Sequence, residues 1–535
     1  MRHHQSQKFR AVRIIQTMCL LLFVVHLAIQ ALYLARPDFL RKNVINKNQT
    51  ESWAQDLQVD TAKDTAKGLS LISDPRDIEN SFDKNLRSEH DIQKTRERNE
   101  HDIQKVQEQV RHRAWMDLIK ANETMSTESC ENDFGFGLVS RWAAAKKEWC
   151  RPSISCYPMM QTGHGGNGDN LCVLNNVSFD PKPYNDDRRT RQLILAYRDT
   201  SHEDAAYMHH DTPIIQTRCS KTSDVWRDDQ LPGWNADWMI GGLAIDRQIS
   251  CESTEDKTLL IIQRDSFANL YHNSEDFFNA FLALLIAGLR PDQVRVFLAD
   301  LYPWGPFESL WKHLFPDVRT AWEMRVENAT CYKSVIVGIY GPASPLTLIN
   351  LNSNCFRSPL VRAYARWVWS SFGLSPQPQH NRSRLLWMSR QPSVRWPERA
   401  YCDDRYFRCE DWTHLGIRSI ARVLNNDAEV VAALAARSEL EVVGLDFNKL
   451  PFEEQVGRVA ASDIMSGPHG AGLTHLLFLP DWACVFELFI DGSEANIHFT
   501  NLATWRGLRY GSIVIDNPAP PDRVVQELWT ACAPR

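Results

Sequence analysis

The stretch Ser466-Gly-Pro-His-Gly-Ala-Gly-Leu-Thr-His475 decides the fold class of this chain. It follows the run 463–466, which is typical of a strand, and leads into 473–478, which is typical of a helix. Its glycines permit backbone angles and close approaches that other residues forbid. The free N–H groups at the start of a helix, together with the helix dipole, favour an anion such as a diphosphate. The stretch therefore predicts either an anion-binding turn or a tight turn that binds nothing.

Five residues of this stretch are candidate ligands for such an anion. His469 and His475 could donate hydrogen bonds from their rings to phosphate oxygens. Gly470, Ala471 and Gly472 could offer their backbone N–H groups where the helix begins.

Outward from this stretch, strand-like runs alternate with helical patterns. In the C-terminal region strands are predicted at 384–388, 440–445, 463–466 and 484–489, and helices at 427–436, 453–460, 473–478 and 499–505. In the preceding region strands are predicted at 192–197, 259–263, 294–298 and 334–339, and a helix at 274–287. Such alternation predicts parallel sheets with right-handed crossovers. We therefore expect an α/β fold with two Rossmann-like domains, 126–375 and 376–535, and a cleft between them.

The N-terminus carries an apolar run, 14–35, that is long enough to cross a bilayer as a helix. Arg2, Lys8, Arg10 and Arg13 precede it, so the tail 1–13 is expected to stay in the cytosol while the rest is translocated. A cleaved signal peptide is the alternative, but the run exceeds a usual apolar signal core and no Ala-x-Ala site closes it. We therefore expect a single-pass type II membrane protein.

A polar stem is predicted at 36–125. Glu-His-Asp-Ile-Gln-Lys occurs at 89–94 and again at 100–105, a period of 11. This period keeps Ile92 and Ile103 on one stripe of a helix, joined by Val106 and Val110. The stem is therefore either a helix that pairs with a second copy of the chain or a solvated spacer helix.

Composition narrows the class of protein further. Hydrophobic residues make up 43% and charged residues 24%, which is ordinary for a globular chain. The net charge of −6 gives no reason to expect a nucleic-acid partner, which normally needs a basic face.

Glycosylation acceptors and cysteines agree with a luminal location. Asn-x-Ser/Thr tripeptides beyond the apolar run begin at Asn48, Asn122, Asn176, Asn328 and Asn381. Eleven cysteines are expected to pair mostly into disulfides, with at least one left over: Cys130, Cys150, Cys156, Cys172, Cys219, Cys251, Cys331, Cys355, Cys402, Cys409 and Cys532. Cys484 lies in the apolar run Ala-Cys-Val-Phe and is expected to be a small buried residue.

The segment from His469 to Ala483, continued by Val485-Phe-Glu-Leu488, resembles the signature block of glycosyltransferase family 61. Within that family it is similar to members that transfer N-acetylglucosamine to EGF domains; plant β-1,2-xylosyltransferases belong to the same family. The resemblance is specific over 463–510 and looser back to Leu259. It implies the two-domain GT-B fold, a UDP-sugar donor and inversion to a β-linkage.

The resemblance also implies roles for two residues on the donor side. Glu487 lies in the strand after the signature helix, where GT-B enzymes commonly place a carboxylate that binds the ribose hydroxyls of UDP. A Glu in an apolar strand is costly to bury without a partner, which fits a ligand role; a salt bridge at the strand end is the alternative. Arg390 follows the first strand of this domain, where its guanidinium could neutralise the departing diphosphate or simply be solvated.

On the acceptor side, Asn269-Leu-Tyr-His272-Asn-Ser-Glu-Asp276 resembles the Asn-x-x-His-x-x-x-Asp block of the family. A spacing of four places His272 and Asp276 on one face of a helix. Inverting transfer needs a base that takes the proton of the acceptor hydroxyl, so either residue, or both as a pair, is a candidate catalytic base. The alternative is a helix N-cap whose charges hold the surface between the domains.

Metal chemistry is not expected. Asp-x-Asp, the metal-binding signature of many other glycosyltransferases, is absent from the sequence, and so is any Cys-x-x-Cys pair. We therefore predict no cofactor and no essential divalent metal.

Together these features predict an inverting transferase that moves N-acetylglucosamine from UDP-GlcNAc to a secretory glycoprotein or glycan. GlcNAc is preferred because Pro480-Asp-Trp-Ala is similar to the GlcNAc-transferring members. Two alternatives stay open: a UDP-xylose-dependent β-1,2-xylosyltransferase, and a non-catalytic glycan-binding or scaffold protein on the same fold. The apolar run and stem predict the Golgi membrane, with the endoplasmic reticulum as second choice.

Overall fold

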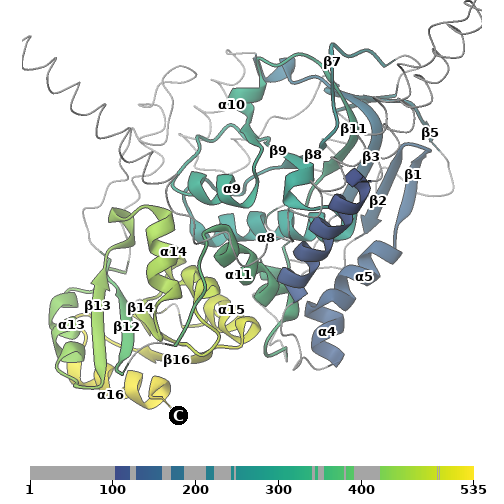
Figure 1. The fold of residues 1–535 in the computed structure, drawn as a ribbon. Coiled ribbons are helices and arrows are strands. Elements are labelled where there is room, and N and C mark those ends of the chain that lie inside the picture. Colours follow the sequence, from purple (N-terminus) through teal and green to yellow (C-terminus); the bar gives the residue numbers. More distant parts are fainter. Residues whose placement is uncertain are drawn as a thin grey trace, which may run out of the picture. The chain divides into compact units, whose positions relative to one another are not determined.

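The computed structural model describes residues 103–120, 128–158, 170–185, 213–221, 242–245, 249–339, 341, 344–347, 355–378, 381–390, 422–490, 492 and 494–534. The chain divides into two units, Met1–Val106 and Gln107–Arg535, and both sheets belong to the second unit (Figure 1). The predicted tail, the apolar run 14–35 and the strand expected at 192–197 lie outside the described residues. Within the described ranges, no helix combines the length and the apolar character needed to cross a membrane.

The C-terminal sheet has five strands in the order β13, β12, β14, β15, β16. Their bounds are β12 (Ser383–Met388), β13 (Leu440–Leu445), β14 (Ile464–Pro468), β15 (Cys484–Phe489) and β16 (Arg509–Val514). All neighbouring strands are parallel, as the sequence predicts. The chain adds β13 on one side of β12 and then β14 on the other, so the direction of winding reverses between β12 and β14. This order defines a doubly wound sheet.

Helices cover both faces of this sheet, which explains why its strands are apolar at successive positions. The helices are α13 (Asp427–Ala435), α14 (Phe452–Ala460), the 3₁₀ helix η9 (Ala471–Phe478), α15 (His498–Arg506) and α16 (Pro521–Cys532). Leu385 and Trp387 of β12 share a hydrophobic cluster with α13 and α16. Leu386 and Met388 lie in a different cluster, with α14, η9 and α15. Successive side chains of β12 thus pack on opposite faces.

The other sheet has eleven strands among the described residues. Their bounds are β1 (Lys147–Arg151), β2 (Ile154–Pro158), β3 (Asn170–Phe179), β4 (Ile215–Thr217), β5 (Ser220–Lys221), β6 (Leu243–Ile245), β7 (Ser253–Glu255), β8 (Thr258–Ile262), β9 (Val294–Leu298), β10 (Val318–Thr320) and β11 (Thr330–Val337). The main order is β10-β9-β8-β11-β3-β2-β1-β5.

This sheet is mixed, which differs from the prediction of a second Rossmann-like, parallel domain. β10, β9, β8 and β11 are parallel, as expected from the runs 259–263, 294–298 and 334–339. β11, β3, β2, β1 and β5 pair antiparallel. Only Pro152 and Ser153 separate β1 from β2, which leaves no length for the crossover that parallel pairing requires.

Helix α8 (Leu270–Ala287) contributes side chains to a hydrophobic cluster that also contains residues from strands of both sheets. Its N-cap is Asn269, whose Oδ1 accepts a hydrogen bond from the N–H of Tyr271 at 3.0 Å. The helix ends at Gly288, which has φ of 66°. Apolar side chains of α8 and of α11 (Pro359–Ser371) share one hydrophobic cluster with η9 and α15.

Cys484 is buried, as predicted, but it was not expected among the pairing cysteines and forms a disulfide with Cys532 in the last turn of α16. An unpaired cysteine was expected because eleven is an odd number, and that count left out Cys484. With Cys484 included the number is even, so this reason for an unpaired cysteine no longer applies. Four further disulfides confirm that most cysteines pair: Cys130–Cys355, Cys150–Cys219, Cys156–Cys172 and Cys251–Cys331. Cys402 and Cys409 lie outside the described residues.

The described part of the predicted stem is the helical segment 103–120. Near its C-terminal end Trp115 and Ile119 are buried in the core of the second unit. Ile103, Val106 and Val110 are each more than half exposed, at 58%, 58% and 62%. Pairing of the stem with a second copy stays a prediction.

Candidate functional site

The reversal of winding between β12 and β14 brings two sequence-predicted residues together. Arg390 follows β12 and His469 follows β14, and Nη1 of Arg390 donates a hydrogen bond to the carbonyl oxygen of His469 at 2.9 Å. In open α/β sheets, ligands bind beyond the carboxyl ends of the strands at such a switch point. The predicted anion-binding turn therefore lies where this fold ordinarily binds its ligand.

The glycines of the turn allow this close packing. Gly470 has φ of 147°, which strains any residue with a side chain, and a Cβ there would lie 2.6 Å from Nη1 of Arg390. A Cβ at Gly472 would lie 2.9 Å from the sulfur of Met388. Ala471 and Gly472 open η9 and are partly exposed. The turn thus presents the start of a helix at the edge of the sheet.

Behind the turn, Glu487 joins two side chains in the core. Its Oε1 accepts from Nδ1 of His469, and its Oε2 accepts from the hydroxyl of Tyr510 at 2.5 Å. His469 is 3% exposed and Glu487 has no exposed surface. Burial, together with the charge of Glu487, raises the pKa of Tyr510, so its hydroxyl stays a donor. The sequence did not point to Tyr510 as part of the site.

His475 lies inside the turn rather than at its surface. Its Nδ1 is 2.8 Å from the carbonyl oxygen of Gly472, and its Nε2 is 2.8 Å from Oε1 of Gln455. Its ring packs against Phe447, with centroids 4.3 Å apart. Burial lowers the pKa of His475 to about 4, so the ring is neutral at physiological pH. A neutral imidazole carries a single N–H, so it donates to only one of these two oxygens. The ring lies inside the protein, and the structure gives His475 a role in supporting the turn.

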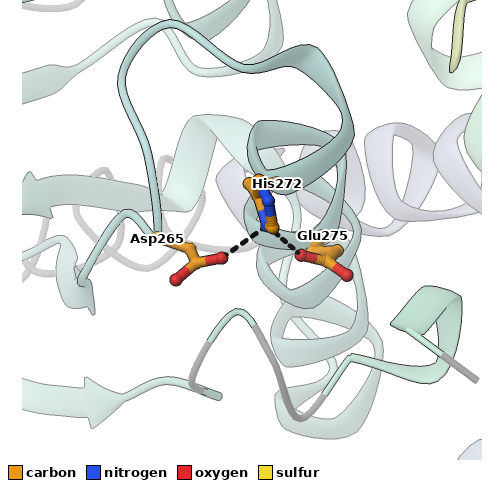
Figure 2. Close-up of side chains that lie close together, drawn as sticks. All are labelled: Asp265, His272 and Glu275. Atoms are coloured by element: carbon orange, nitrogen blue, oxygen red, sulfur yellow. Dashed lines mark hydrogen bonds and ion pairs between the residues drawn. The ribbon is translucent and has the colours of Figure 1, made fainter. Parts of the chain in front are cut away.

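The second group of predicted residues lies at the start of α8. Figure 2 shows the imidazole of His272 between two carboxylates: Nδ1 is 2.6 Å from Oδ2 of Asp265 and 3.2 Å from Oε2 of Glu275. Asp265 comes from the loop after β8, and Glu275 lies one turn further along α8. The side chain of His272 is 33% exposed, whereas those of Asp265 and Glu275 are 2% and 1% exposed. His272 is therefore the member of this cluster that reaches the surface.

The two carboxylates fix the protonation of His272. Burial lowers its pKa, but the hydrogen bonds and charges of Asp265 and Glu275 outweigh burial and raise the pKa to about 11. At neutral pH the imidazole therefore carries a proton on both nitrogens. It must lose one before it can accept a proton from an acceptor hydroxyl.

Asp276 lies behind this cluster, with no exposed surface. Its Oδ2 accepts a hydrogen bond from the N–H of Asp265 at 3.0 Å. Burial, with the nearby charge of Asp265, raises the pKa of Asp276 well above its usual range. This position suits holding the loop at Asp265 better than meeting a substrate. The sequence did not identify Asp265 or Glu275; a carboxylate directly after a buried strand is the signal that could have pointed to Asp265.

Asp265, His272 and Glu275 also form a donor set that could hold a divalent cation. Their ligand atoms all lie within 4.8 Å of one another. One imidazole nitrogen with two carboxylates suits borderline ions such as Zn²⁺ or Mn²⁺. The prediction that no divalent metal is essential stays a prediction.

Aromatic contacts bring the two groups of predicted residues close to each other. The hydroxyl oxygen of Tyr271 lies 2.7 Å from Nδ1 of His498, at the start of α15. The next residue, Phe499, packs against Tyr271 with ring centroids 6.3 Å apart and against His469 with centroids 5.2 Å apart. The neighbour of His272 and the histidine of the turn thus pack on the same phenylalanine.

A doubly wound sheet with a glycine turn and an arginine at its switch point defines an α/β protein with a candidate nucleotide-binding edge. Residues 348–486 match the family described as Glycosyltransferase 61. The chain is 29% identical over 273 residues to the EGF domain-specific O-linked N-acetylglucosamine transferase of Drosophila melanogaster, covering 49% of this chain and 46% of that protein. It is also 29% identical over 272 residues to the protein of that name in Gallus gallus, covering 49% and 45%.

These findings confirm the resemblance to glycosyltransferase family 61. The matched residues contain β12, the turn at 469–472 and the first half of β15, and they end one residue before Glu487. The chain spans a little under half the length of the curated relatives it matches, at 46% and 45%.

Proposed function

We propose that this chain is an inverting glycosyltransferase that moves N-acetylglucosamine from UDP-GlcNAc to a glycoprotein or glycan of the secretory pathway. The main support is the contact of both Tyr271 and His469 with Phe499. It makes the candidate base a neighbour of the candidate diphosphate site, as a direct displacement requires. The family match supports sugar transfer, and the names of the two relatives, both N-acetylglucosamine transferases, support the choice of donor sugar.

In the proposed reaction the acceptor hydroxyl attacks the anomeric carbon of the donor sugar. The new carbon–oxygen bond forms as the bond from that carbon to the diphosphate oxygen breaks, and UDP leaves with the bonding electrons. Arg390 and the N–H groups of the turn offset the charge that develops on the diphosphate. The proton of the acceptor hydroxyl passes to Nε2 of His272, in molecules where this nitrogen is unprotonated, while Asp265 and Glu275 hold Nδ1.

The N-terminal segments suggest where the chain is located and with what it assembles. The apolar run 14–35 anchors the chain in the Golgi membrane with residues beyond it in the lumen, and the stem supports a homodimer. Alkaline extraction of membranes tests the anchor, since an anchored chain stays in the pellet. Recovery of a shortened chain in the supernatant would contradict the anchor and leave the enzymatic proposal standing.

A donor panel tests the enzymatic proposal. The full chain, purified from a secretory host, is mixed with UDP-GlcNAc, UDP-xylose, UDP-GalNAc or UDP-glucose, with and without EDTA, and its thermal stability and release of UDP are measured. A ligand at a hundred times its dissociation constant adds about 2.7 kcal/mol of stability. We expect UDP-GlcNAc to stabilise the chain and to be hydrolysed slowly, and EDTA to change neither. A response to UDP-xylose alone would favour the xylosyltransferase, and no response to any of them would favour the scaffold protein.

A further inference from the structure

The buried group His469–Glu487–Tyr510 is not explained by donor binding alone. Glu487 lies on β15, between β14 and β16, where it is opposite Gly467 on β14 and Ser512 on β16. It has no exposed surface, and both carboxylate oxygens already accept hydrogen bonds from protein groups. A carboxylate oxygen can accept two hydrogen bonds, so these bonds alone do not exclude a ligand, but a carboxylate without exposed surface is out of reach of a ribose hydroxyl. The ribose-binding role that the sequence predicts therefore conflicts with its position.

The partner of Glu487 is a histidine whose ring is held on several sides. A carboxylate can only accept, so Nδ1 of His469 carries the proton that it donates to Glu487. Phe489 stacks on the ring with centroids 5.2 Å apart, and Phe499 meets it at an angle of 64°. Among the described residues no side chain bonds to Nε2, the nitrogen on the opposite side of the ring. The ring is fixed, and Nε2 is the atom left for a ligand.

The backbone of His469 is fixed as well. Its N–H donates to the carbonyl oxygen of Leu488 at 2.8 Å, and its carbonyl oxygen accepts from Arg390. Gly470 follows directly and opens the turn. An anion at this turn would therefore approach His469 on the side away from Glu487. An imidazolium between a carboxylate and a phosphate can donate from both nitrogens.

We propose that Glu487 and Tyr510 are positioning residues that orient His469, so that Nε2 faces the diphosphate of the donor rather than Glu487 itself binding the ribose. This inference rests on the proposed function, because it names what one histidine of the donor site does and what holds it. Tyr510 secures the second oxygen of Glu487, which would otherwise be a buried acceptor without a donor. Removing either residue leaves the turn in place but frees the ring of His469.

Nucleotide binding separates the two roles of Glu487. Dissociation constants for UMP and UDP are measured with the full chain and with Glu487→Gln, Tyr510→Phe and His469→Ala. If the ring of His469 binds the second phosphate, Glu487→Gln and Tyr510→Phe raise the dissociation constant of UDP about tenfold, because a hydrogen bond to a charged group is weakened. The dissociation constant of UMP, which lacks that phosphate, changes by no more than about twofold. In the His469→Ala background the Tyr510→Phe change then has no further effect on UDP. If Glu487 instead bound the ribose, Glu487→Gln would weaken the binding of UMP and of UDP equally.

Tyr364→Phe is the matched control. Tyr364 is fully buried in α11, and its hydroxyl has no hydrogen-bond partner among the described residues. Its loss should therefore change neither the stability of the chain nor its affinity for UDP. A Tyr510→Phe variant that behaves like this control would overturn the positioning role.

A second readout does not depend on the donor. In histidine-selective ¹⁵N spectra, the Nδ1 proton of His469 is expected far downfield in the wild-type chain and in Tyr364→Phe, and shifted or lost in Glu487→Gln. An unchanged signal in Glu487→Gln would overturn the inference whatever the affinities. If the spectra behave as expected but the wild-type chain binds no UDP, the proposed function fails, and the inference fails with it because no diphosphate is recognised.

Discussion

His272 and Asp276 show what a motif can and cannot give at the scale of single residues. Their spacing of four placed both on one helix face, and α8 does begin beside them. The sequence could not separate them, because burial is set by the loop after β8 and not by the helix. His272 reaches the surface, whereas Asp276 holds the backbone of Asp265 from inside. Asp265 itself lies outside the motif, three residues after the end of β8, so the motif alone does not identify it.

The pH dependence of the reaction follows from the pKa of His272. If His272 is the base, it must lose a proton that Asp265 and Glu275 hold with a pKa of about 11, so the rate of UDP release rises with pH across the neutral range. Asp265→Asn removes one charge and lowers this pKa, so the rise is complete at a lower pH. Asp256→Asn, an exposed aspartate of the same sheet region, is the control. A pH-independent rate in the wild-type chain would exclude His272 as the base.

The lowered pKa of His475 predicts that the free energy of unfolding falls in acid. Its pKa is about 4 in the folded chain and 6.5 in the unfolded chain, so between these values only the unfolded state binds the proton. Stability is fully present above pH 6.5 and falls by about 3 kcal/mol as the pH drops to 4. His475→Asn keeps a donor for the carbonyl of Gly472 and should flatten this part of the curve. Urea denaturation at several pH values measures it, and equal slopes for both chains would contradict the argument.

At the scale of elements, the C-terminal half was predictable and the other half only in part. Parallel strands buried on both faces give apolar runs that stand out between helices, and each run predicted from 384 to 489 is a strand of the five-stranded sheet. β16 and α16 were not predicted, because β16 is only partly buried and lacks such a run. The antiparallel strands β1 to β3 were not predicted; β1 and β2 form a hairpin with a two-residue turn, and β3 pairs with the distant β11.

We predict that a glycine-to-alanine substitution has opposite effects on stability at Gly470, which precedes η9, and at Gly457 in α14. Gly470→Ala introduces a side chain at φ of 147° and against Arg390, so we expect a loss of about 1–3 kcal/mol in unfolding free energy, together with weaker UDP binding. Gly457→Ala lies within α14, where a Cβ meets nothing within 4 Å. It should stabilise the chain by about 0.5–1 kcal/mol. Chemical denaturation of both variants tests this, and a harmless Gly470→Ala would contradict the described turn.

At the scale of the whole molecule, the second unit has two sheets that share one hydrophobic core through α8, α11, η9 and α15. The sequence predicted two domains with a cleft, since each half has its own strand pattern. It could not show that these helices pack together, because no local pattern records contacts between halves. The family resemblance was recognisable because its signature lies in one continuous segment, 469–488.

Long-range disulfides stabilise this unit according to the chain length they close. Cys130–Cys355 joins residues 225 apart in sequence, whereas Cys156–Cys172 joins residues 16 apart. If the main effect is on the unfolded chain, removing the first pair with serines should cost about 2 kcal/mol more than removing the second. Thermal unfolding of the two double variants compares them. Equal losses would mean that the loop length does not decide the effect.

The central claim is that residues from both sheets form one transferase site, and UDP release tests it most directly. The full chain and His272→Ala are incubated with UDP-GlcNAc, and the release of UDP is followed at equal occupancy of the donor. The account predicts measurable release by the wild-type chain and a rate about a hundredfold or more lower in the variant, with the dissociation constant of UDP unchanged. No release by the wild-type chain, or equal rates for both, would contradict it.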